Sequence, residues 1–149
     1  LTIAGTDDGE QPALENFLSK HPQGNIRFLG PIFGKEKNSW LMNSHFYILP
    51  SLSEGFPTSV LEAMAAGLVA IITKGCNFPE ALENGMAIET KPTLSDLIST
   101  FNGLPEISDV ELLDRAQSSQ KWVQQHYLWD KIAAIQAELY FQKSAQSRN

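Results

Sequence analysis

The stretch SLSEGFPTSVLEAMAAG, residues Ser51–Gly67, decides the fold of this chain. A short apolar run, Phe46–Leu49, precedes it, and a second one, Leu68–Ile72, follows it. This order predicts a strand, a loop, a helix and another strand, which together make one βαβ unit. Pro57 suits the first helical turn because its missing N–H costs nothing there. Gly67 suits the position just past the end of the helix.

Two carboxylates in this unit are placed so that one ligand could reach both. Glu54 follows the first strand, at the edge of the sheet where open parallel sheets bind ligands. Glu62 lies about one turn into the helix, and its side chain leans back toward the helix N-terminus. Free N–H groups of the first turn form an anion site between them; these groups belong to Thr58, Ser59 and Val60. Two hydroxyl acceptors beside a phosphate site suit a sugar joined to a nucleotide through a diphosphate. The alternative is that both glutamates are solvated surface acids.

The segment PSLSEGFPTSVLEAMAAGLVAIIT, residues 50–73, resembles the signature of glycosyltransferase family 4. Members of that family are retaining enzymes of the GT-B type with two glutamates separated by seven residues. The resemblance implies that Glu54 contacts the donor sugar as the catalytic residue and that Glu62 contacts the nucleotide ribose. It also implies that the intervening backbone binds sugar hydroxyls and phosphate, through Gly55, Phe56, Pro57, Thr58, Ser59 and Val60. One departure is Pro57, where the family usually has glycine, because proline removes an amide and restricts the loop.

The rest of the chain alternates in the same way. Further strands are predicted in three short runs: LTIA at 1–4, IRFLG at 26–30 and MAIE at 86–89. Helices are predicted in four segments: Pro12–His21, Lys35–Asn43, Leu94–Phe101 and Asp109–His126. The pattern predicts an α/β fold.

The resemblance makes the predicted fold more specific. It implies a Rossmann-like three-layer sandwich with a mainly parallel five-stranded sheet, a GT-B C-terminal half that lacks its first strand. Without that strand the order becomes 2-1-3-4-5 in the numbering of this chain. Either LTIA pairs directly with FYIL at 46–49, or another chain fills a gap between them. Residues 1–149 would form one nucleotide-sugar-binding domain, with a closing helix and a frayed tail at 127–149.

Other side chains are further candidates for the site. By the resemblance, Pro31 and Ile32 are candidates to flank the nucleotide base, although an ordinary packed loop is the alternative. Lys74 could meet a phosphate or be a solvated lysine. Cys76 has no visible base partner, so we do not expect a nucleophile there. The histidines lack metal-ligand spacing, so we expect no metal site, and no cofactor other than the donor substrate.

Composition limits the class of protein. The chain has 149 residues, 42% of them hydrophobic and 19% charged, which is ordinary for a globular domain. Its net charge of −6 argues against nucleic acid as a partner. The single cysteine excludes an internal disulfide and fits a reducing compartment, so a cytoplasmic location is expected. A response-regulator receiver is rejected because Pro50 and Ser51 stand where that family needs an aspartate.

The resemblance implies the donor-binding domain of a glycosyltransferase, which transfers a sugar from a nucleotide diphosphate sugar to a hydroxyl acceptor with retention. The match covers only the second half of such an enzyme. The family's diphosphate-gripping arginine and lysine and its N-terminal acceptor-binding half are missing from the match. The chain is therefore either a fragment or a reduced protein, and alone we expect it to be inactive. Any membrane association would be peripheral and made through the missing half. The alternative is a non-catalytic, degenerate nucleotide-sugar-binding module.

Overall fold

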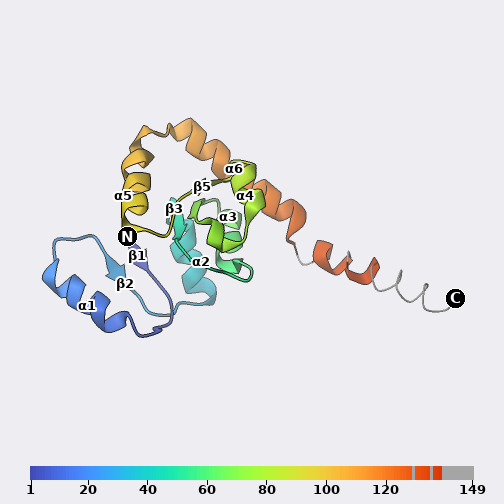
Figure 1. Cartoon of the computed structure of the whole chain (residues 1–149). Coiled ribbons are helices and arrows are strands. Elements are labelled where there is room, and N and C mark those ends of the chain that lie inside the picture. The colour runs from blue at the N-terminus through green and yellow to red at the C-terminus, as the bar shows by residue number, and fades with distance from the viewer. Residues whose placement is uncertain (129, 135, 139–149) are drawn as a thin grey trace. The chain divides into compact units, whose positions relative to one another are not determined.

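The structure is a computed structural model that describes residues 1–128, 130–134 and 136–138. Contacts divide the chain into two units, Leu1–Trp40 and Leu41–Asn149. The described helices and strands follow one another along the chain (Figure 1) as β1 (Thr2–Ile3), α1 (Gln11–Lys20), β2 (Arg27–Phe28), α2 (Gly34–Met42), β3 (Phe46–Leu49), α3 (Thr58–Ala65), β4 (Val69–Ile72), η1 (Lys74–Cys76), α4 (Pro79–Glu83), β5 (Ala87–Glu89), α5 (Leu94–Gly103), η2 (Leu104–Glu106) and α6 (Asp109–His126).

The first unit is built on a short parallel pair, with β1 beside β2 and α1 as the crossover between them. The loop before α1 is organised by Asp7, whose Oδ1 accepts the N–H groups of Gly9 at 2.7 Å and Gln11 at 2.9 Å. These hydrogen bonds, that from Gln11 first, lower the pKa of Asp7 because they stabilise the carboxylate.

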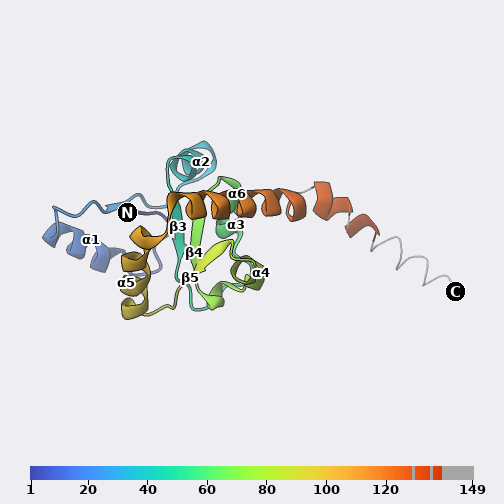
Figure 2. The same ribbon diagram turned by 90° about the horizontal axis from the view of Figure 1, so that it is seen from above.

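The second unit contains the parallel sheet β3-β4-β5. Phe46 pairs with Val69 and Leu49 with Ile72, so all four residues of β3 are in register with β4. Every residue of β4 is buried, as expected for a central strand covered on both faces. The helix α6 lies alongside α3 (Figures 1 and 2), where the Gln120 amide donates to the carbonyl oxygen of Ala65 at 2.8 Å.

The core of the second unit forms where α3 and β4 meet. Val60, Ala63 and Met64 on α3 are fully buried, as are Ala70 and Ile72 on β4. Because α3 presents small and apolar residues at helical spacing, its backbone lies close to the sheet. The loops that follow β3 and β4 therefore begin at strands that are packed in or against the core.

One fold prediction needs correction. The α/β class with parallel strands is confirmed, but the strands form two sheets, β1-β2 and β3-β4-β5, instead of one five-stranded sheet. Of the two alternatives for LTIA, direct pairing with FYIL is not among the strand pairs of the described residues. Apolar patterning identifies strands but does not encode which strand becomes the neighbour, because pairing needs backbone groups from distant segments within hydrogen-bonding distance.

The predicted closing segment at 127–149 is described only in part. Helix α6 ends at His126, and residues 130–134 and 136–138 are again helical. The predicted frayed tail lies outside the described residues. Within the described residues, no helix is long and apolar enough to cross a membrane.

Candidate functional site

Glu54 is held at its backbone and at its side chain. It lies half-buried in the loop Ser51–Pro57, which joins β3 to α3 and is called the Glu54 loop below. The hydroxyl of Ser51 donates to Oε1 of Glu54 at 2.5 Å. The N–H of Glu54 donates to the carbonyl oxygen of Gly75 at 2.8 Å. The predicted catalytic carboxylate is therefore oriented by its own protein.

The rest of the loop is partly open to solvent. Gly55 is exposed, and its carbonyl oxygen accepts the side-chain amide of Asn77 at 3.1 Å. Phe56 is 48% exposed and stacks on Tyr127, with ring centroids 5.5 Å apart. Pro57 is fully buried. Of these three predicted substrate-binding residues, Gly55 and Phe56 are accessible to a ligand, whereas the Pro57 side chain is not.

The start of α3 corrects the predicted anion site. The N–H of Thr58 donates to the carbonyl oxygen of Phe56 at 2.9 Å, and that of Val60 to the carbonyl oxygen of Pro57 at 3.0 Å. These two N–H groups are thus not free. The reason is that Pro57 is the N-cap residue of a helix that begins at Thr58, with φ −83° and ψ 71°. This bend brings the two carbonyl groups onto the first turn, although the dipole of α3 still favours an anion there.

The remaining predicted residues of α3 differ in exposure. Glu62 is exposed, Ser59 is half-buried, and the Val60 side chain is fully buried. Val60 is accordingly a core residue whose contribution to a ligand would come from its backbone alone.

Tyr47 on β3 interacts with residues of this site, which was not predicted from the sequence. Burial raises the pKa of its phenol, a hydrogen bond with the Ser59 side chain opposes the rise, and the negative charges of Glu62 and Glu54 add to it. Tyr47 therefore lies close enough to both carboxylates to sense their charges. A tyrosine inside the otherwise apolar run FYIL was the clue, because a buried phenol normally needs a polar partner.

The two candidates for flanking a base lie in the other unit. Pro31 is exposed and Ile32 is half-buried, both just after β2. Their contact with a base stays a prediction.

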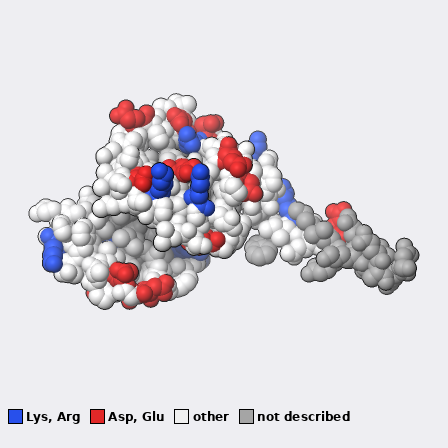
Figure 3. All heavy atoms as spheres, in the orientation of Figure 1, with Lys and Arg blue, Asp and Glu red and all other residues white. Residues whose placement is uncertain are grey.

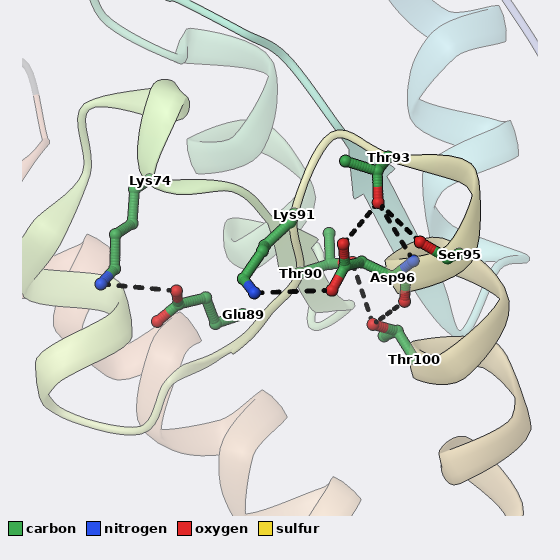
Figure 4. Close-up of polar contacts among 8 residues, drawn as sticks. All are labelled: Lys74, Glu89, Thr90, Lys91, Thr93, Ser95, Asp96 and Thr100. Carbon is green, nitrogen blue, oxygen red and sulfur yellow. Dashed lines mark hydrogen bonds and ion pairs between the residues drawn. The ribbon is translucent and has the colours of Figure 1, made fainter.

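Lys74 has an acidic partner. Its Nζ lies 3.6 Å from Oε1 of Glu89, and the two side chains are 80% and 45% exposed (Figure 4). The pair borders an open pocket of about 430 Å³ lined by Lys74, Asn77, Pro79, Leu82, Glu83 and Glu89. A solvated lysine with a weak surface ion pair describes Lys74 better than a dedicated phosphate ligand.

Cys76 and the metal-ligating residue types have no catalytic arrangement in the described residues. Cys76 is fully buried, and its thiol donates to the carbonyl oxygen of Leu49 at 3.2 Å. Among residues 1–128, 130–134 and 136–138, no group of three or more His, Cys, Asp or Glu side chains could hold a metal ion. On the face drawn in Figure 3, Lys and Arg side chains are interspersed with Asp and Glu instead of forming a continuous basic surface.

Comparison with known proteins points to one family. The family model described as "Glycosyl transferases group 1" matches residues 1–101, about two thirds of the chain. Among curated proteins, a phosphatidylinositol N-acetylglucosaminyltransferase subunit of Arabidopsis thaliana is 27% identical over 125 residues. The match covers 80% of this chain and 28% of that protein, so the chain spans less than a third of this relative's length.

Solved structures share the fold. Sucrose-phosphate synthase from Thermosynechococcus elongatus superposes with a TM-score of 0.81 at 19% identity, covering 98% of this chain and 39% of that one. HepE from Anabaena, solved in complex with UDP and glucose, superposes with a TM-score of 0.73 at 18% identity, covering 97% and 40%. The Rossmann-like fold of the C-terminal half of such GT-B proteins is thus the fold of this chain.

Proposed function

Because the chain belongs to the glycosyl transferases group 1 family, we propose that it is the donor-binding part of a retaining glycosyltransferase. It would take a sugar from a nucleotide diphosphate sugar and transfer it to a hydroxyl acceptor. The observation that carries this proposal is the fixed carboxylate of Glu54 at the carboxyl end of β3, the edge of a parallel sheet where ligands bind.

Each glutamate has a separate proposed role as the pair of the motif with seven intervening residues. Glu54 contacts the donor sugar: Ser51 donates to Oε1 of Glu54, and the carboxylate accepts a sugar hydroxyl. Glu62, exposed on α3, accepts the ribose hydroxyls. The diphosphate lies between them, where the positive end of the α3 dipole stabilises the leaving group. In this proposal no metal or other cofactor takes part.

The relatives suggest which molecules to test first. The Arabidopsis relative is named a phosphatidylinositol N-acetylglucosaminyltransferase subunit, and HepE was solved with UDP. UDP and UDP-N-acetylglucosamine are therefore the donor probes, and phosphatidylinositol is the first acceptor.

The proposal is tested by titration calorimetry with UDP. Loss of a hydrogen bond to a charged acceptor costs about 1.5–3 kcal/mol, so Glu62→Ala should weaken UDP binding about tenfold or more with little change in stability. Glu106→Ala, an exposed glutamate in η2, is the matched control and should bind UDP as the wild type does. Unchanged affinity in Glu62→Ala would refute the ribose assignment.

The sugar assignment is tested in the complete enzyme. Glu54→Gln should lower the turnover of UDP-N-acetylglucosamine more than it weakens binding of UDP, because its partner is the sugar. Equal losses would show that the roles of the two glutamates have been assigned wrongly. We propose further that the 149 residues alone bind the nucleotide without transferring sugar, since positioning of an acceptor supplies up to about 7–11 kcal/mol of the barrier reduction. A non-catalytic module would bind nucleotide sugar but give no transfer in the complete protein either.

A further inference from the structure

The turn that follows β4 is bonded to the Glu54 loop. This turn, Thr73–Asn77, is called the β4 turn below. The Thr73 hydroxyl, in a side chain that is 2% exposed, donates to the carbonyl oxygen of Ser51. Gly75 offers its carbonyl oxygen to the N–H of Glu54 at 2.8 Å. Because Ser51 in turn donates to Oε1 of Glu54 at 2.5 Å, a chain of hydrogen bonds leads from the β4 turn to the carboxylate.

Two further contacts fasten the turn on either side of Glu54. Asn77 has a left-handed backbone, φ 52°, and its amide Nδ2 donates to the carbonyl oxygen of Gly55 at 3.1 Å. Cys76 donates from its buried thiol to the carbonyl oxygen of Leu49 at 3.2 Å, at the end of β3. The residue after Glu54 and the strand before it are thus held by neighbouring residues of one turn.

The two segments also pack without space between them. A Cβ added to Gly75 would lie 2.4 Å from the carbonyl oxygen of Leu52 and 2.6 Å from that of Ser51. Backbone atoms of the Glu54 loop therefore occupy the place of a side chain at Gly75. By contrast, Glu62 lies on α3, whose position is set by the buried residues Val60 and Met64.

We propose that the β4 turn positions Glu54 for the donor sugar, with Thr73 and Asn77 as the positioning residues. Replacement of either residue should weaken binding of the sugar and leave binding of the nucleotide unaffected. The inference rests on the proposed function, in which Glu54 contacts the sugar and Glu62 the ribose. The physical basis of the inference is that a carboxylate contributes to sugar binding only in the right orientation. The β4 turn orients Glu54 through the bond from Thr73 to Ser51 and through the bond from the Glu54 N–H to Gly75.

The first test uses Asn77→Asp. Aspartate keeps the size of asparagine and tolerates the left-handed backbone, but its carboxylate cannot donate to Gly55. The matched control is Asn84→Asp, which removes a similar amide bond, from Asn84 Nδ2 to the carbonyl oxygen of Glu80 at 2.8 Å, at the end of α4. Titration calorimetry with UDP and with UDP-N-acetylglucosamine should show that Asn77→Asp weakens only the sugar nucleotide, by about threefold to tenfold. Asn84→Asp should leave both affinities unchanged.

The second test uses the buried hydroxyl and includes a rescue. Thr73→Val removes the donor to Ser51 at constant shape, whereas Thr73→Ser keeps it. We expect Thr73→Val to weaken binding of UDP-N-acetylglucosamine but not of UDP, and to speed hydrogen exchange of the Glu54 amide. Thr73→Ser should restore both properties. If Thr73 had only a structural role, Thr73→Val would weaken binding of both ligands together. Thr73→Ser would then not restore binding of UDP-N-acetylglucosamine selectively.

The outcomes separate this inference from the proposed function. If the wild type binds neither UDP nor UDP-N-acetylglucosamine, the proposed function fails, and positioning for a sugar fails with it. If the wild type binds both and the Asn77 and Thr73 variants lose both affinities equally, or neither, then the positioning role alone is overturned.

Discussion

Replacement of Gly75 by alanine tests the contact between the β4 turn and the Glu54 loop by steric means. The added Cβ would lie 2.4 Å from the carbonyl oxygen of Leu52, whereas real Cβ atoms essentially never come within 3.0 Å of such an atom. The difference, 3.0 − 2.4 = 0.6 Å, is the smallest shift that relieves the clash. Because the obstructing atoms are backbone, no side-chain rotation can absorb it. The Glu54 loop must move away from Gly75, and Glu54 moves with it.

The size of the effect follows from that shift. A misplacement of about 1 Å can cost about 100-fold in rate, so we expect turnover of the complete enzyme to fall about 10-fold to 100-fold in Gly75→Ala. Overpacking costs about 1–3 kcal/mol, so the midpoint of thermal unfolding should also fall by several degrees. Affinity for UDP should change less than turnover, because the proposed ribose contact, Glu62, lies on α3.

The assay needs a glycine whose replacement is harmless. Gly103 ends α5 with φ −81°, and a Cβ there would meet no atom within 4 Å. Gly103→Ala should therefore keep wild-type turnover and equal or slightly higher stability. Wild-type turnover and unfolding midpoint in Gly75→Ala would refute the reasoning from the close approach.

Three further predictions concern stability, each checked by urea unfolding. Met64→Ala, at a fully buried position, should lower the free energy of unfolding by about 2–5 kcal/mol. Met42→Ala, at a position 76% exposed, should change it by no more than about 0.5 kcal/mol. Similar losses in the two variants would contradict the assignment of the core. The pKa of Tyr47 is raised above 10.0, chiefly by burial. Its contribution to the free energy of unfolding is therefore fully present below pH 10.0 and should decline as the pH rises through the raised pKa. Tyr47→Phe should remove the part of the fall in stability at high pH that comes from Tyr47. A pH profile of stability that is the same in Tyr47→Phe and the wild type would contradict this prediction. Arg115→Met removes the guanidinium that donates to the carbonyl oxygen of Gly85 at 2.7 Å, and the free energy of unfolding should fall by about 1.5–3 kcal/mol. A loss near zero would show that this contact between α6 and the segment before β5 does not stabilise the fold.

The sequence alone predicted the features that depend on neighbours along the chain. The apolar runs around Ser51–Gly67 identified β3, α3 and β4, because strand and helix periodicity are properties of consecutive residues. The same reasoning placed Glu54 in the loop after β3 and Glu62 on α3. The family resemblance drawn from this stretch agrees with the family model that matches residues 1–101.

Other features were decided by tertiary structure. The carbonyl oxygens of Phe56 and Pro57 accept hydrogen bonds from N–H groups that the helical pattern predicted to be free. The direction of these carbonyl groups depends on the path of the loop and not on its composition. Likewise, the division into two sheets depends on which strands meet.

The surroundings of Glu54 show the physical reason most clearly. Thr73 reaches Ser51 across 22 positions of the chain, and Cys76 reaches Leu49 across 27. Such contacts require that α3 packs on the sheet and returns the chain parallel to β3. No local pattern distinguishes Gly75, where the fold requires the absence of a side chain, from Gly103, where it does not. The sequence thus determines which residue types are available to the site, and long-range packing determines which of them orient its carboxylate.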